Sequence, residues 1–280
     1  MRKHADLIFH LVSLSALVIA LLALAALVFD IVSDGAGRLS LSFLTNIASR
    51  KAEEAGVYHA LMGSIWVIAL TAALALPIGV AAAIFLEEYG SRSRTARFIE
   101  LNISNLAAVP SIIYGLLGLG LFVRLLAMGQ SVLAGAATLA LLALPVVILS
   151  TREALRTVPN SIREGSYALG ATKWQTIWNQ VLPMAMPGVL TGLILALSRA
   201  VGETAPLITI GALTYIPFAP DGIWSKFTVL PIQVFNWVSR PQPEFKANAA
   251  AGILVLMVLL LSMNAIAIVV RDRQQRRGRA

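Results

Sequence analysis

The 280-residue sequence contains no cysteine and only three histidines, His4, His10 and His59. The missing cysteines exclude a disulfide framework, a thiolate metal site and a cysteine nucleophile. The histidines are scattered along the chain, so we do not expect a zinc cluster. Charged residues are scarce as well, at 13%, whereas an average soluble domain has about 25%. That scarcity, together with 58% hydrophobic residues and a mean hydropathy of +0.80, indicates a membrane protein.

Several catalytic and nucleotide-binding motifs are also missing. Without a G-x-x-x-x-G-K-[ST] run, the chain is not expected to bind ATP by a phosphate-binding loop, and we expect it to bind no cofactor. There is no H-E-x-x-H run, and the three histidines lie near the ends of apolar segments, which disfavours a Ser/His/Asp enzyme. The net charge of +8 is not read as a nucleic-acid signal, because the basic residues lie between apolar segments and at the chain ends, where membrane topology explains them.

What the sequence does contain is a series of long apolar segments. A helix needs about 20 apolar residues to cross the hydrocarbon core of a bilayer, and six segments reach this length. We therefore predict an all-α, polytopic membrane bundle with six transmembrane helices. Pro77 is expected to bend the second helix, and Pro110 to break or kink the third. The predicted spans are Leu7–Phe29, Val57–Leu86, Leu101–Val123, one within Leu125–Ser150, Met184–Gly211 and Ala247–Val270.

The positions of lysine and arginine predict the orientation of these spans. With both termini in the cytoplasm, the inside segments hold 14 Lys and Arg residues and the outside segments hold 7, which agrees with the positive-inside rule. The first apolar run is longer than a signal-peptide core and has no clear cleavage site, so we interpret it as an uncleaved anchor. The predicted organisation is an N-terminal helix and outer loop (1–56), a membrane domain (57–271) and a basic cytoplasmic tail (272–280).

The fifth apolar segment carries an arginine and a glutamate, Arg199 and Glu203. A charge in the hydrocarbon costs roughly 3 kcal/mol on insertion scales, so such a residue normally faces the bundle interior or a water-filled path. The i, i+4 spacing places the two side chains on one helix face, where they can pair. The guanidinium also matches the oxygens of an oxyanion. Two interpretations follow: a substrate path, or an ion pair that only fixes helix packing.

The loop between the fourth and fifth spans, residues 151–183, predicts two short helices. Ser161 and Glu164 have the spacing of a capping box, and Gly170 suits a helix end that needs a positive φ. A second helix, Thr172–Val181, has Trp174, Ile177, Trp178 and Val181 on one face, and Pro183 is expected to end it. This loop is interpreted either as an amphipathic helix lying on lipid or as a helix that docks in the groove of a cytoplasmic partner.

The same loop resembles the coupling loop of bacterial ABC importer permeases. The resemblance rests on Glu164-x5-Gly170-x11-Leu182-Pro183; Gly165 and Ser166 replace the two alanines of that family's pattern, and Gln180 replaces an isoleucine. It implies that the loop docks on an ATP-hydrolysing subunit. The residues implied in this docking are Glu164, Gly165, Ser166, Ala168, Leu169, Gly170, Ala171, Thr172 and Lys173.

Other segments resemble the permeases of phosphate importers, the PstA and PstC families. Val109–Leu119 and Arg199–Leu207 are similar to their third-span and fifth-span signatures, and Phe227–Trp237 with Pro241–Phe245 is similar to the PstA outer loop. The resemblance implies a type I ABC importer permease with a MetI-like core in the bacterial inner membrane. It further implies a PstC-like second permease, a PstB-like ATPase dimer that uses ATP and Mg²⁺, and a PstS-like periplasmic phosphate-binding protein. The substrate-path residues expected from this sequence are Arg199, Glu203, Ser111 and Tyr114.

Three alternatives remain at this point. The substrate could be another oxyanion, such as sulfate, molybdate or a phosphonate, or the chain could be the PstC-like partner. A secondary anion transporter would need ion-coupling acids within its spans and often has inverted repeats, yet Glu203 is the one carboxylate deep in a predicted span. A purely structural subunit would need no path residue, and Arg199 argues against it.

Overall fold

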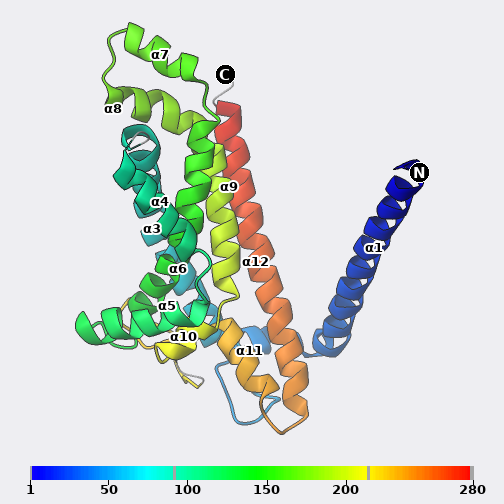
Figure 1. Cartoon of the computed structure of the whole chain (residues 1–280). Helices are drawn as coiled ribbons and strands as arrows, with labels where there is room; N and C mark the ends of the chain where they lie inside the picture. Colours follow the sequence, from blue (N-terminus) through cyan, green and yellow to red (C-terminus); the bar gives the residue numbers. More distant parts are fainter. Residues whose placement is uncertain (1, 91–92, 213–214, 278–280) are drawn as a thin grey trace.

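The protein is described by a computed structural model that covers residues 2–90, 93–212 and 215–277, and these residues form helices and connecting loops (Figure 1). Five helical segments are long and apolar enough to cross a membrane, which confirms the predicted all-α membrane bundle. The helices at the centre of these segments are α1 (Arg2–Gly35), α3 (Tyr58–Ile84), α6 (Val132–Arg156), α9 (Leu182–Val201) and α12 (Glu244–Arg277).

The third predicted span is two helices and not one. Helix α4 (Arg94–Leu106) and helix α5 (Ser111–Gly118), which continues as a π-helical segment η3 (Leu119–Leu125), are bent by 105°. The predicted break at Pro110 is confirmed: Pro110 has no N–H to donate and disfavours helical geometry in the residue before it. Counting this bent pair as one crossing gives six spans, as predicted; otherwise the structure has five.

The fifth predicted span is shorter at its end than the sequence suggested. Helix α9 ends at Val201, and a separate short helix α10 (Ala205–Thr209) follows after Gly202–Thr204. The prediction of one helix to Gly211 was therefore wrong. Pro206 lacks an N–H, and its ring would clash with the carbonyl of Gly202 in a continuous helix.

At its other end the fifth span is longer than predicted. Helix α8 (Lys173–Thr176), the π-helical turn η4 (Ile177–Val181) and α9 form one continuous helical segment, so Pro183 does not end a helix. Pro183 lies in the first turn of α9, directly after the π-helical turn. A π-helical turn inserts an extra residue into the hydrogen-bond ladder, which accommodates the donor that proline lacks. Pro77 likewise lies inside a continuous α3.

The centre of the bundle is formed by α3, α6 and α9, with α6 between the other two, and α12 packs along α9 (Figure 1). Small side chains line these contacts and let the helices approach closely. Ala75 of α3, Ala140 and Ala143 of α6, and Ala196 of α9 belong to one buried cluster. Two thirds of the apolar window of α6 is buried, so α6 is the structural axis of the membrane domain.

Helix α1 contacts this bundle at one end and leans away from it along the rest of its length (Figure 1). No residue in its most apolar stretch is buried, and Gly35 at its end packs directly against the backbone of Ala250 and Ala251 in α12. The following segment is held by Arg38, which donates to Asn248 Oδ1 at 2.7 Å and to the carbonyls of Ala52 and Ala55. It contains a 3-10 turn η1 (Ala36–Arg38) and helix α2 (Leu41–Thr45).

The two ends of the bundle carry different elements (Figure 1). One end carries helix α7 (Asn160–Ala168), helix α8 and a π-helical turn η2 (Phe85–Tyr89) that extends α3; we call it the α7 end. The opposite end carries helix α11 (Leu230–Val238) and the α2 segment, and we call it the α11 end. Helices α1 and α12 both point their terminal ends toward the α7 end (Figure 1).

Candidate functional site

The predicted coupling loop forms a helical hairpin that projects from the α7 end (Figure 1). Helix α7 ends at Ala168, and Gly170 turns the chain with a φ of +84°, as predicted. The predicted cap at Ser161 is wrong, because α7 begins one residue earlier, directly after Pro159, and has no side-chain cap. The capping box lies instead at the next helix, where Thr172 and Gln175 bond each other's backbone at the start of α8.

Most of the residues implied in docking lie on an exposed surface of this hairpin. Leu169 is 90% exposed, although leucine is an apolar residue that is usually buried. Ser166 and Ala171 are half-buried, and Ser166 forms a hydroxyl–hydroxyl hydrogen bond of 2.8 Å with Thr176. The exposed members of the predicted set are Glu164, Gly165, Ala168, Leu169, Gly170, Thr172 and Lys173.

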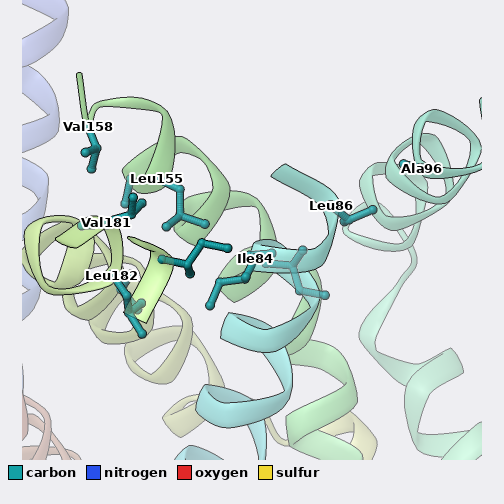
Figure 2. Close-up of a cluster of buried hydrophobic side chains, with 13 residues drawn as sticks. Ile84, Leu86, Ala96, Leu155, Val158, Val181 and Leu182 are labelled. Carbon is teal, nitrogen blue, oxygen red and sulfur yellow. The ribbon is translucent and has the colours of Figure 1, made fainter. Parts of the chain in front are cut away.

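The apolar face predicted for Thr172–Val181 is divided between two environments. Ile177 and Val181 are fully buried and pack with Ile84, Leu155 and other residues of the apolar cluster shown in Figure 2. Trp174 and Trp178 stack on each other, with ring centroids 5.7 Å apart, and remain largely exposed beside an apolar groove of α3. The helix is therefore held by the bundle on one side and presents indoles at the surface on the other.

A second candidate site lies where α9 ends. Arg199 Nε is 3.5 Å from Glu203 Oε1, so the predicted pair is present, although Glu203 lies beyond the helix. Arg199 is 17 residues after Leu182, which corresponds to about 26 Å along the helix axis, and it therefore lies toward the α11 end. Its side chain is 52% exposed and that of Glu203 is 20% exposed. The adjacent Ser198 donates to Asn264 Oδ1 of α12 at 2.8 Å, which fixes the rotation of α9.

The two signature segments meet beside this pair. Helix α5 packs on α10, and a Cβ added to Gly115 would lie 2.7 Å from Pro206 Cα. Tyr114 is buried, and its hydroxyl donates to the carbonyl of Leu106 at 2.8 Å, which closes the break between α4 and α5. Ser111 is half-buried at the first position of α5.

Comparisons with known proteins show the family to which the chain belongs. Residues 75–277 match the family described as "Binding-protein-dependent transport system inner membrane component". The chain belongs to this family. The permease is 37% identical to phosphate transport system permease protein PstA 1 of Mycobacterium tuberculosis, over 80% of this chain and 72% of that one. It is 31% identical to PstA of Yersinia pestis, over 96% and 90% of the two chains.

The fold of the permease also matches a solved transporter. A chain of the inward-facing MetNI methionine ABC transporter superposes with a TM-score of 0.61 at 20% identity, covering 79% of this chain and 96% of that one. The MetI-like fold implied by the sequence is thereby confirmed. The permease is a multi-pass inner-membrane component of a binding-protein-dependent transport system. In the described parts of the chain, no three His, Asp or Glu side chains are placed to hold a metal ion.

A network of ion pairs lies at the α7 end of the permease and was not predicted from the sequence. Glu87 accepts from Arg152 and Arg156, both at 3.0 Å, and Glu88 pairs with Arg163 at 2.7 Å. Arg152 also pairs with Glu100 of α4. One signal was present in the sequence: two adjacent glutamates end the apolar run of the second span. The arginines had been assigned to topology alone, which hid these partners.

Replacing Gly115 with alanine is expected to destabilise the permease by about 1–3 kcal/mol, the usual cost of overpacking. The added methyl group would meet the Pro206 backbone and Thr209, which lies 2.8 Å from the added Cβ position. Thermal unfolding of the purified protein in detergent checks this. Gly120→Ala is the matched control, because Gly120 is also helical but a Cβ added there would meet nothing within 4 Å. This glycine-to-alanine change is expected to raise the free energy of unfolding by up to about 1 kcal/mol, because alanine favours a helix. Equal behaviour of the two variants would contradict the packing described here.

Proposed function

We propose that this permease is the PstA-type subunit of an ATP-driven phosphate importer, and that Arg199 lies in the phosphate path. The observation that carries the proposal is the Arg199–Glu203 pair, which lies beside the contact between the two signature segments. Each of these segments lies next to a helix break, between α9 and α10 in one case and between α4 and α5 in the other. The 37% identity to a phosphate transport system permease supports the substrate class.

The exposure of Arg199 supports a path between two subunits. Of its two neighbours in sequence, Ser198 is half-buried and Ala200 is buried, whereas Leu195, the next residue on the same helix face, is 63% exposed. An arginine with half its side chain outside the bundle would be costly against acyl chains. A second permease of the PstC type that covers this face would give Arg199 a water-filled path in place of lipid.

The chemistry of the pair suits an oxyanion that must bind and then leave. The guanidinium presents a planar fork of donors to phosphate oxygens and stays charged at any relevant pH. Glu203 competes for the same donors at 3.5 Å and repels the anion. This competition keeps binding weak enough for release, which conduction requires. We propose that Glu203 holds Arg199 when the path is empty. Ser111 and Tyr114 are further proposed to line the path near this pair.

The α7 end is proposed to face the cytoplasm, as the positive-inside count suggests. Two ATPase subunits of the PstB type would use ATP and Mg²⁺, and one would receive α7 in a groove, with Glu164 to Lys173 at the contact. A PstS-type binding protein would deliver phosphate to the α11 end. Nucleotide-driven closure of the ATPases would then move α7 and rock the spans between the two openings.

Uptake of labelled phosphate, with unlabelled sulfate as competitor, tests the proposed substrate. Cells that lack this permease are supplied with the wild-type chain or with an empty vector. The expected result is phosphate uptake that needs the chain and that excess sulfate does not reduce. Uptake of sulfate but not phosphate would assign another oxyanion. Phosphate uptake that persists when the ATPase subunit is inactivated would indicate a secondary transporter.

A further inference from the structure

Arg163 of α7, the proposed docking helix, lies at a junction of three helices. Its guanidinium donates to the carbonyl of Leu155 in the last turn of α6, at 3.0 Å, and to that of Val158 just after α6, at 2.7 Å. The same guanidinium pairs with Glu88 of η2 at 2.7 Å. The two charged side chains are only 15% and 7% exposed. Helix α7 is thereby attached to α3, which is more than seventy residues away in sequence.

The two adjacent glutamates of η2 point to different helices. Glu87 binds Arg152 and Arg156 of α6, whereas Glu88 binds Arg163 of α7. Both lie on the π-helical turn that ends α3, and π-helical turns are frequent at functional sites. Glu87 therefore joins two spans of the bundle, and Glu88 joins a span to the docking helix.

Further contacts reinforce the second of these connections. Lys173, at the start of α8, donates to the backbone carbonyl of Glu88, and its ammonium lies 4.6 Å from the centre of the Tyr89 ring. The Ser166–Thr176 hydrogen bond closes the hairpin itself. Ile162 of α7 packs on the apolar cluster that contains Ile84 and Leu155. The hairpin is thus attached to the end of α3 from both of its helices.

We propose that Glu88 is a positioning residue for transport, which makes α7 and the adjoining end of α3 move as one unit. A displacement of α7 by the ATPase is then delivered directly to α3, in addition to α6 and α9, its neighbours in sequence. Separating Glu88 from Arg163 would leave two buried charges without partners, which is strongly disfavoured. Packed interfaces also switch between discrete arrangements more readily than they deform gradually, so α7 and the end of α3 are expected to move together. The pair therefore transmits motion. This inference rests on the proposed function, because it assumes that an ATPase moves α7.

The test uses the full complex in proteoliposomes and compares phosphate imported with ATP hydrolysed. Glu88→Gln keeps the side-chain volume and removes the charge. We expect normal capture of the ATPase and retained hydrolysis, but at least about a fivefold fall in phosphate imported per ATP, the lower end of typical coupling between sites. Glu153→Gln is the matched control: it removes a carboxylate from an exposed pair with Arg156 at the same end and should change nothing.

Two outcomes would overturn the proposal. One is unchanged import per ATP in Glu88→Gln. The other is parallel loss of ATPase capture, hydrolysis and import, which would mean that Glu88 only holds the docking surface together. If Glu88→Gln does not assemble, Glu88→Asp serves instead, because it keeps the charge on a shorter side chain and should show the same selective loss of import per ATP.

A distance measurement separates this inference from the choice of substrate. The chain has no cysteine, so spin labels can be placed at Ser161→Cys on α7 and Ile78→Cys on α3, both exposed positions. The distance between the labels should stay constant when ATP is bound and trapped, and should change on trapping in the Glu88→Gln background. A change in the otherwise wild-type complex would refute the rigid unit. If the complex carries no phosphate, the proposed function fails while this distance still reports on the connection.

Discussion

Arg199→Gln is expected to reduce phosphate uptake at least about thirtyfold. A hydrogen bond to a charged group contributes about 2 kcal/mol, and each 1.4 kcal/mol is a factor of ten. Glutamine keeps a hydrogen-bonding group but loses the charge and the planar fork. Labelled-phosphate uptake in cells that lack the native permease measures the effect, and the amount of assembled complex in the membrane is measured alongside.

The control is Arg124→Gln, which makes the same chemical change at an exposed arginine at the end of η3. It should leave uptake near the wild-type level. Normal uptake by Arg199→Gln would show that the Arg199–Glu203 pair only fixes packing. Loss of the assembled complex in that variant would point to the same conclusion, because a path residue on an exposed face is not needed for the fold.

Leu169→Asp is expected to weaken capture of the ATPase subunit about thirtyfold or more. Leu169 is 90% exposed at the end of the proposed docking helix, and a docking helix places such apolar anchors in its partner's groove. Truncation of an interface hot spot costs about 2 kcal/mol or more, and an aspartate would also bring a charge into the groove. Co-purification of the ATPase with the permease from detergent measures capture, and ATP-dependent uptake should fall with it.

The matched control for this variant is Leu41→Asp, which makes the same change at another highly exposed leucine, in α2 at the α11 end. It should capture the ATPase normally. Weakened capture in both variants would mean that the loss is general damage to the membrane domain. Normal capture by Leu169→Asp would place the docking contact elsewhere on the hairpin.

Features that depend on a few neighbouring residues could be predicted from the sequence. The apolar segments predicted the membrane spans, because a run of about 20 apolar residues can cross the hydrocarbon as a helix whatever the rest of the chain does. Pro110 predicted the break between α4 and α5, and Gly170 predicted the turn between α7 and α8. Two helix boundaries near prolines were predicted wrongly, because a proline and the surrounding apolar run indicated different ends for the same helix. Pro183 was expected to end a helix that continues through it, and Pro206, at the position where α9 should have continued, divides the fifth span.

The candidate site was predicted only in part, because its partners are distant in sequence. The i, i+4 spacing predicted the Arg199–Glu203 pair, but not that the arginine would lie at the end of α9 with half its side chain exposed. Gly115 packs closely against Pro206, and nothing in the sequence identified Pro206 as its neighbour. These facts depend on the rotation of each helix about its axis.

The class of protein, the approximate positions of the membrane segments and the hairpin that resembles a coupling loop could all be predicted from local sequence patterns. These follow from hydrophobic transfer and from the stiff backbone of proline and the permissive backbone of glycine, which act within one or two helical turns. The pairing of Glu88 with Arg163, and of Glu87 with Arg152 and Arg156, became visible only in the packed structure. Such pairs form between residues 65 to 75 positions apart, and their choice depends on how three helices pack, which no local pattern encodes.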